Sequence, residues 1–163
     1  EKALKLFYND LLADKRSFIF LFEEKNKIFG VAASTKDANS FFKEFKRKNI
    51  FRLIPPMISK SVKDPVFPFR LAFSQEYPKV PEAELLILFV AAISRGRNIG
   101  TKLVRRTIEE FKKKKVSEFK ITILSKNIKG KEFYRKRGFM NTGKFKYLNE
   151  AREIYLYKLN NTN

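Results

Sequence analysis

The chain contains neither cysteine nor histidine among its 163 residues. Without cysteine it forms no disulfide, and without both residue types it offers no cysteine or histidine ligand to a metal ion. Catalytic mechanisms that use a Cys–His pair or a Ser–His–Asp triad are excluded for the same reason. Any chemistry must therefore use carboxylates, tyrosine, lysine, hydroxyl groups or the backbone. The absence of cysteine is also compatible with a reducing compartment, and we expect a cytoplasmic protein.

Long hydrophobic runs are also missing. The longest apolar run, Leu85–Ile93, is far shorter than the ~20 residues that a membrane-spanning helix needs. We therefore expect no membrane span and interpret the run as a buried strand. Proline is confined to one part of the chain, since all six prolines lie between residues 55 and 81. Because proline lacks an amide donor, we expect residues 50–82 to hold loops, a short helix and a strand near 69–74.

Charge of one sign dominates the composition, with 36 lysines and arginines against 17 acidic residues and a net charge of +19. This excess indicates either an anionic partner, such as nucleic acid, a phosphorylated ligand or an acidic lipid, or a solvated lysine-rich surface. The stretch FFKEFKRKNIFR (41–52) interleaves Phe with Lys, which suits base stacking. However, Phe41, Phe42 and Phe45 have helical spacing, which is more typical of a core. Nucleic-acid binding therefore stays an alternative.

The periodicity of apolar residues predicts one mixed α/β domain spanning 1–163. The expected helices cover residues 2–12, 38–48, 100–115 and 127–137. The expected strands cover residues 16–24, 27–35, 82–92, 118–124, 138–148 and 152–159. The first two strands form a hairpin with its turn at 25–26, and the last two form a closing hairpin. Asp37 is placed to cap the helix that follows it.

The stretch SRGRNIGTKL (94–103) joins an expected strand to an expected helix. Backbone amides at a helix start carry partial positive charge and lack intrahelical partners, so they suit a phosphate. Gly96 and Gly100 allow close backbone approach, and Arg95 and Arg97 add positive charge. The pattern is neither that of a P-loop nor G-x-G-x-x-G. We interpret it as a pyrophosphate cradle, with an ordinary strand-to-helix loop as the alternative.

The same region resembles a known family motif. LFVAAISRGRNIGTKL (88–103) is similar to the acetyl-CoA-binding segment of the GNAT acyltransferase superfamily, whose signature is [QR]-x-x-G-x-[GA]. Arg95 and Gly100 match the two ends of that signature, while Asn98 stands where its first glycine is expected. Asparagine tolerates positive φ better than most residues, so we expect the loop to keep its shape.

A second segment strengthens the resemblance. NIKGKEFYRKRGF (127–139) is similar to the family's N-x-x-[AG]-x-x-[FL]-Y-x-x-x-GF pattern, and the two motifs stand in the family's order. The positions that match are Asn127, Gly130, Phe133, Tyr134, Gly138 and Phe139. The resemblance covers residues 83–159. It implies a GNAT-like fold: a central, mostly antiparallel sheet with a splayed parallel strand pair and helices on both faces. The family's first strand is not visible before the N-terminal helix.

The resemblance implies an N-acetyltransferase that uses acetyl-CoA. The amine acceptor would attack the thioester directly in a ternary complex, with residues 83–159 as the cofactor-binding half and residues 37–81 as the variable acceptor-side segment. The residues expected to bind coenzyme A are Phe89, Val90, Arg95, Gly96, Arg97, Asn98, Ile99, Gly100, Thr101, Asn127, Gly130 and Tyr134. Lys102, Arg105 and Arg106 either reach cofactor phosphates or face solvent.

Two residues are catalytic candidates by this resemblance. Tyr134 is the candidate general acid for the departing thiolate, and packing of the short helix is its alternative role. Glu84 is the candidate general base, with a strand-start salt bridge as its alternative and Glu76 and Glu82 as rivals. Asn127 either contacts the cofactor or caps a helix.

The acceptor is not determined by the motifs. Its cleft is expected to involve the N-terminal helix, residues 37–81 and the last hairpin, including Tyr147. The basic charge favours an anionic acceptor, for example an amino-sugar nucleotide. A nucleic-acid-binding protein and a non-catalytic coenzyme A-binding module remain the alternatives, and we expect a monomer or a homodimer.

Overall fold

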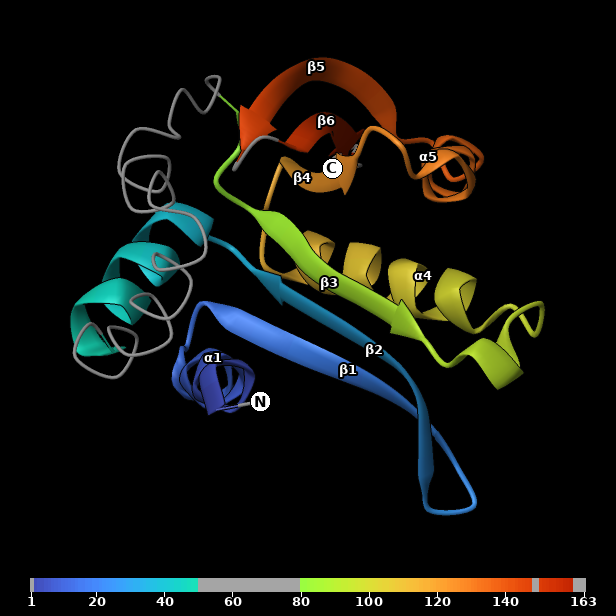
Figure 1. Ribbon diagram of the computed structural model, residues 1–163, viewed down its shortest axis with the longest axis horizontal. Helices are drawn as coiled ribbons and strands as arrows, with labels where there is room; N and C mark the ends of the chain where they lie inside the picture. The colour runs from blue at the N-terminus through green and yellow to red at the C-terminus, as the bar shows by residue number, and fades with distance from the viewer. Residues whose placement is uncertain (1, 50–79, 148–149, 160–163) are drawn as a thin grey trace, which may run out of the picture.

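The computed structural model describes residues 2–49, 80–147 and 150–159 (Figure 1). Its elements in chain order are α1 (Lys2–Ala13), β1 (Ser17–Glu24), β2 (Lys27–Thr35), a helix over 38–49, β3 (Glu84–Val90), the short 3₁₀ helix η1 (Ala92–Ser94), α4 (Ile99–Lys113), β4 (Glu118–Leu124), α5 (Ile128–Arg135), β5 (Met140–Tyr147) and β6 (Glu150–Lys158). The helices and strands predicted within these ranges are therefore present. Asp37 caps its helix as expected, because its Oδ1 accepts a hydrogen bond from the Ser40 amide at 2.8 Å.

The strands form one six-stranded sheet in the order β1-β2-β3-β4-β6-β5. Every neighbouring pair is antiparallel except β3 and β4, which are parallel. The parallel pair is in register only at Glu84 and Lys120, whereas β4 and β6 stay paired over seven residue pairs. The predicted mostly antiparallel sheet with a splayed parallel pair is confirmed.

Helices cover both faces of the sheet (Figure 1). Successive strand residues point to opposite faces, and the two core clusters follow this alternation. Ala32 and Leu85 belong to the cluster that contains the buried side chains of α4 and Tyr134 of α5. Ala33 belongs to a second cluster with Leu11 of α1 and Phe41. The two helices nearest the N-terminus therefore pack on the face opposite to α4 and α5.

The long apolar run differs from its prediction. We expected a buried strand over 82–92, but β3 ends at Val90 and η1 follows it. Phe89 is 54% exposed and Ile93 87% exposed, so the run leaves the core at its carboxyl end. Within the described ranges, no helix is long and apolar enough to cross a membrane. The loops, short helix and strand expected over 50–79, and the rival base Glu76, lie outside the described residues.

The helix boundaries differ from the prediction by small amounts. α4 begins at Ile99 and ends at Lys113, whereas the expected helix ran from 100 to 115. Lys115 has a φ of 56°, which ends the helix before its lysine run is complete. α5 likewise stops at Arg135, and Gly138 with a φ of 85° turns the chain into β5. The carboxyl ends of α4 and α5 are thus each followed by a residue with a positive φ.

Phe119 tests the packing of the sheet against α4. Its side chain is fully buried, and its ring lies 4.5 Å from that of Phe111 and 5.4 Å from that of Phe139, measured between centroids. We expect Phe119→Ala to lower the free energy of unfolding by about 3–5 kcal/mol, because it leaves a cavity in the core. Chemical denaturation measures this loss. Ile93→Ala, at an exposed position, should change it by no more than about 0.5 kcal/mol, and equal losses would contradict this packing.

Candidate active site

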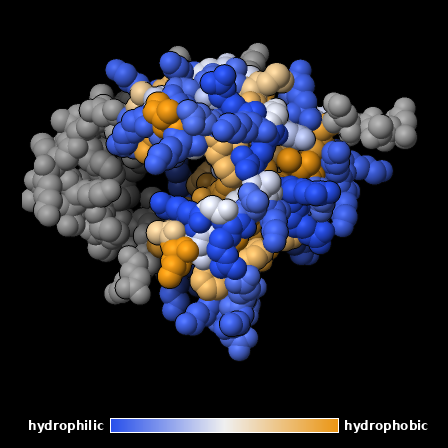
Figure 2. All heavy atoms as spheres, turned by 90° about the vertical axis from the view of Figure 1, so that its right-hand side faces the viewer, coloured by the Kyte–Doolittle hydropathy of each residue, from blue (hydrophilic) through white to orange (hydrophobic). Residues whose placement is uncertain are grey.

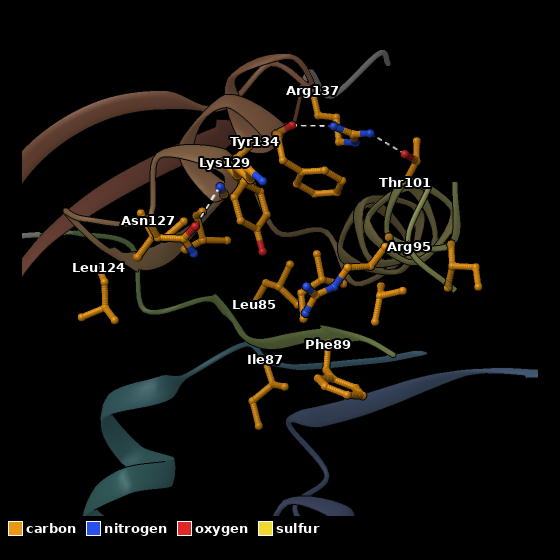
Figure 3. A pocket seen from close by; sticks show the side chains of 18 of the residues that line it. Leu85, Ile87, Phe89, Arg95, Thr101, Leu124, Asn127, Lys129, Tyr134 and Arg137 are labelled. Carbon is orange, nitrogen blue, oxygen red and sulfur yellow. Dashed lines mark hydrogen bonds between the residues drawn. The ribbon is translucent and has the colours of Figure 1, made fainter. Parts of the chain in front are cut away.

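A cleft of about 870 Å³ lies where β3 and β4 diverge. Its walls are residues 85–90 of β3 and 121–124 of β4, with the loop before α4 at one end and α5 above (Figure 3). A volume of this size lies within the range of small-molecule sites. The cleft exists because the two strands meet at one residue pair only.

A β-bulge in β3 lies at the start of this divergence. The register with β2 passes from the pair Ser34–Leu85 to the pair Ala33–Ile87, so Leu86 is the extra residue. A bulge bends its strand and ends regular pairing on the neighbouring edge. β3 stays paired to β2 through Val90. Its other edge therefore faces the cleft with backbone groups that a ligand can reach.

The loop before α4 forms the mouth of the cleft. Gly96 and Asn98 have φ values of 82° and 58°, so both adopt the left-handed conformation. The expectation that Asn98 would tolerate positive φ at the signature glycine position is confirmed. Asn98 is also the N-cap residue of α4, but its side chain makes no capping hydrogen bond. Within the described part of the chain, the first amides of α4 therefore have no capping side chain, as an anion site requires.

Two glycines allow the walls of the cleft to approach each other closely. A Cβ on Gly100 would lie 3.2 Å from the Phe133 ring, so α4 approaches α5 where a side chain would intrude. A Cβ on Gly130 would lie 2.6 Å from Ile123 Cδ1, so the start of α5 rests directly on β4. Both residues line the cleft. Their small size sets its width.

The charges that line the cleft are all positive. The cationic residues are Arg95, Lys129, Arg137 and Arg152, and no described aspartate or glutamate lines it. Figure 3 shows the Arg95 side chain reaching over the cavity. The side of the molecule seen in Figure 2 is largely hydrophilic, with a hollow that exposes apolar residues inside. An anionic ligand with an apolar portion suits this combination.

Other basic residues near the mouth do not face the cleft. Arg97 forms a bidentate ion pair with Glu24 at the end of β1, with hydrogen bonds of 2.8 and 2.7 Å, and it does not line the cleft. Lys102 and Arg106 lie over the rings of Phe22 and Phe20 on β1. The remaining candidate, Arg105, is exposed and pairs with Glu109. Of the five predicted cations, only Arg95 lies at the cavity.

Tyr134 extends from α5 into the cleft between the two splayed strands (Figure 3). Its ring packs at right angles to Phe133 and at a steep angle to Phe139, with centroid separations of 5.1 and 5.2 Å. Burial raises the pKa of the Tyr134 hydroxyl well above its ordinary value. The hydroxyl therefore stays protonated at neutral pH and is placed to donate a proton into the cleft.

Glu84 lies at the closed end of the splay and does not line the cleft. Its Oε2 lies 3.5 Å from Lys120 Nζ, and its Oε1 accepts a hydrogen bond from the Thr122 hydroxyl at 3.1 Å. Burial raises the pKa of the Glu84 carboxyl, while Lys120 and Thr122 oppose that shift. The strand-start salt bridge considered for Glu84 is therefore present. Glu82 does not line the cleft either.

Asn127 is the N-cap of α5, as one of its two expected roles requires. Its Oδ1 accepts a hydrogen bond from the Gly130 amide at 2.9 Å, and it also lines the cleft. Phe89, Val90, Ile99 and Thr101 line the cleft as well. The structure thus brings together every predicted cofactor-binding residue except Arg97.

Arg137 is a cleft residue that the motifs did not identify. Its guanidinium carbon stacks 3.5 Å from the centre of the Phe133 ring, and its Nη2 donates to the Thr101 hydroxyl at the start of α4. Burial lowers the pKa of Arg137. The i, i+4 spacing from Phe133 is a sequence signal for this stacking, although Arg137 occupies a variable position of the pattern. The side chain ties α5 to the mouth of the cleft.

Comparison with protein families identifies the class. The Acetyltransferase (GNAT) family matches residues 1–139, and the chain belongs to this family. The predicted fold, the acetyltransferase class and the use of acetyl-CoA are confirmed as properties of the family. Compared with curated proteins, the chain has no significant match.

Solved structures share the fold at low sequence identity. The ribosomal-protein-S18-alanine N-acetyltransferase of Escherichia coli is 13% identical with a TM-score of 0.58, and the alignment covers 95% of this chain and 76% of that one. A Bacillus anthracis protein solved with acetyl coenzyme A is 14% identical with a TM-score of 0.61, covering 93% and 67%. The Thermoplasma acidophilum PaiA N-acetyltransferase, solved with coenzyme A, is 15% identical with a TM-score of 0.58, covering 96% and 70%.

Gly100 provides a test of the mouth of the cleft. Gly100→Glu puts a carboxylate and a side chain against Phe133 where the cleft is lined by cations, so we expect acetyl-CoA affinity to fall by more than about tenfold. Calorimetric titration measures the change. Gly143→Glu is the matched control, since a Cβ there meets nothing within 4 Å. Equal affinity in both variants, with both folded by circular dichroism, would contradict the assigned mouth.

Proposed function

We propose that the protein transfers an acetyl group from acetyl-CoA to a primary amine by direct attack in a ternary complex. The observation that supports this most is the cleft between β3 and β4, which combines an uncapped helix start, a cationic lining and a buried tyrosine. Membership of the GNAT family gives the proposal its reaction class.

The residues present fit coenzyme A. The phosphates would be held by the amides at the start of α4 and by Arg95. The buried Arg137 Nε, which has no hydrogen-bond partner among the described residues, adds an unused donor in the cleft wall. The free edge of β3 near Val90 would hold the amide-bearing arm. Asn127 would contribute its side chain from the opposite wall. Acetyl-CoA supplies the acetyl group in activated form as a thioester.

Tyr134 is the proposed general acid. Transfer to an amine forms an N–C bond and breaks a C–S bond, so a proton must leave the nitrogen and the sulfur must receive one. The buried Tyr134 hydroxyl holds its proton at neutral pH and points into the cleft. It would donate this proton to the departing sulfur. The remaining contribution of the protein is to hold the two reactants together in the cleft.

The general-base role of Glu84 stays a prediction. The carboxylate is occupied by Lys120 and Thr122 and lies outside the lining of the cleft. This geometry favours a structural role at the closed end of the splay. We propose that water in the cleft accepts the proton of the amine.

The nucleic-acid alternative has little support in the described residues. Phe41 is buried, and the rings of Phe41, Phe42 and Phe45 all contact Phe7 of α1. These aromatic rings thus pack in the core rather than offering a stacking surface. A non-catalytic coenzyme A-binding module is the remaining alternative, and it predicts cofactor binding without acetyl transfer in both the wild type and Tyr134→Phe.

Tyr134→Phe tests the proposed general-acid role of Tyr134. We expect kcat to fall by about 10²–10⁴-fold, because the variant keeps the ring packing and loses only the proton donor. Calorimetric affinity for acetyl-CoA should stay unchanged. Since burial raises the pKa, the wild-type enzyme should keep its kcat between pH 7 and 9 rather than lose it as an ordinary phenol ionises. Unchanged turnover in Tyr134→Phe would contradict the acid role.

Glu84→Gln separates the two roles of this carboxylate. We expect the free energy of unfolding to fall by about 3 kcal/mol, because the buried Lys120 ammonium keeps its charge but loses the Glu84 carboxylate that lies 3.5 Å away. The pH dependence of kcat/KM should stay as in the wild type, since Glu84 does not line the cleft. If the variant instead loses an acidic limb of that profile while staying folded, Glu84 is the general base.

A further inference from the structure

The cleft passes through the sheet from one face to the other. Ile121 and Ile123 of β4 belong to the core cluster on the face of α4 and α5. The alternating residues Thr122 and Leu124 point to the opposite face and also line the cleft. A ligand bound between α4 and α5 can therefore reach, through the gap between β3 and β4, a space on the other face of the sheet.

Arg152 of β6 belongs to this opposite face. The ladder between β4 and β6 is regular, and Arg152 is the partner of Leu124 at its end. The neighbouring Glu153 points the other way, because it pairs with Lys131 of α5 at 3.1 Å. Arg152 also lines the cleft. Of the four cationic residues that line the cleft, Arg152 is the one that lies on a strand.

The guanidinium of Arg152 has unused hydrogen-bonding capacity. Its Nε is buried and has no hydrogen-bond partner among the described residues. Its Nη2 lies 3.6 Å from Glu150 Oε2, beyond hydrogen-bonding distance, and its carbon lies 5.5 Å from the centre of the Tyr147 ring. The ring and the strand hold the side chain in place. A planar guanidinium with free donors binds carboxylate or phosphate groups in two-pronged geometry.

The positions of the other cations assign Arg152 to the acceptor. Arg95 precedes α4 and Arg137 follows α5, and both line the cleft near its mouth, where the cofactor phosphates are expected. Arg152 lies on the far strand, and its positive charge is one of several that oppose the rise in the pKa of Glu84 that burial causes. An anionic group at Arg152 would thus lie beside Leu124, on the face of the sheet opposite to α4 and α5 and away from the expected phosphates.

We propose that Arg152 determines acceptor specificity by pairing with a carboxylate or phosphate group carried by the amine substrate. This inference rests on the proposed function, because it assigns an acceptor to the same cleft. It gives the predicted anionic acceptor a specific binding residue. Tyr147, beneath the guanidinium, positions that residue.

The test compares small amines of similar length that differ in their second group. β-Alanine carries a carboxylate, phosphoethanolamine a phosphate, 3-aminopropanol a hydroxyl and 1,3-diaminopropane a second amine. We expect the wild-type enzyme to favour one of the two anionic amines, which also identifies the anion. Arg152→Gln should lower kcat/KM for that amine by about 10- to 100-fold and leave 3-aminopropanol and the KM for acetyl-CoA unchanged. Arg152→Lys should recover part of the loss.

Arg105→Gln is the matched control, since it removes one arginine from an exposed position outside the cleft. A uniform loss for all amines in Arg152→Gln, or a raised KM for acetyl-CoA, would overturn the proposal. Failure of the proposed function gives a different result, because then the wild-type protein acetylates no amine of the set. Calorimetric titration of the same amines into protein saturated with coenzyme A, or without it if none binds, then decides. Equal binding by wild type and Arg152→Gln would refute the role of Arg152.

Discussion

The geometry of the site depends on the buried ion pair between Glu84 and Lys120, because this pair lies where β3 and β4 meet. It joins β3 to β4 at their only registered residue pair, with 3.5 Å between the charged atoms. Lys120 Nζ also donates to the Pro81 carbonyl, and the Thr122 hydroxyl donates to Glu84. Two buried charges are tolerated here because each has partners. Beyond this closed end, β3 bends at its bulge and the strands separate.

The opening is held by packing as well as by strand geometry. β3 is paired with β2, and β4 is paired with β6. Each strand that forms a wall of the cleft is therefore held by a neighbouring strand on its other edge. Arg137 connects α5 to α4 across the mouth through Phe133 and Thr101. The site is therefore carried by strands and helices rather than by a loop alone, which is how a protein fixes two reactants in one geometry.

Local patterns predicted most of the fold and part of the site. The helices, the hairpins, the positive φ of Asn98 and the cap made by Asn127 follow from periodicity and residue chemistry. The partners of charged side chains did not follow, because they depend on long-range contacts. Arg97 pairs with Glu24, which is 73 residues away. Arg152 enters the cleft only through the register of β6 on β4, and no motif contains that register.

Amide hydrogen exchange with and without acetyl-CoA tests the central claim most directly. The claim is that the edge of β3 freed by the splay, together with the start of α4, binds the cofactor. The account predicts slower exchange in residues 86–90 and 95–101 when acetyl-CoA is added, with no change in α1 or β5. Protection confined to other elements, or none in these two segments despite measured binding, would contradict it.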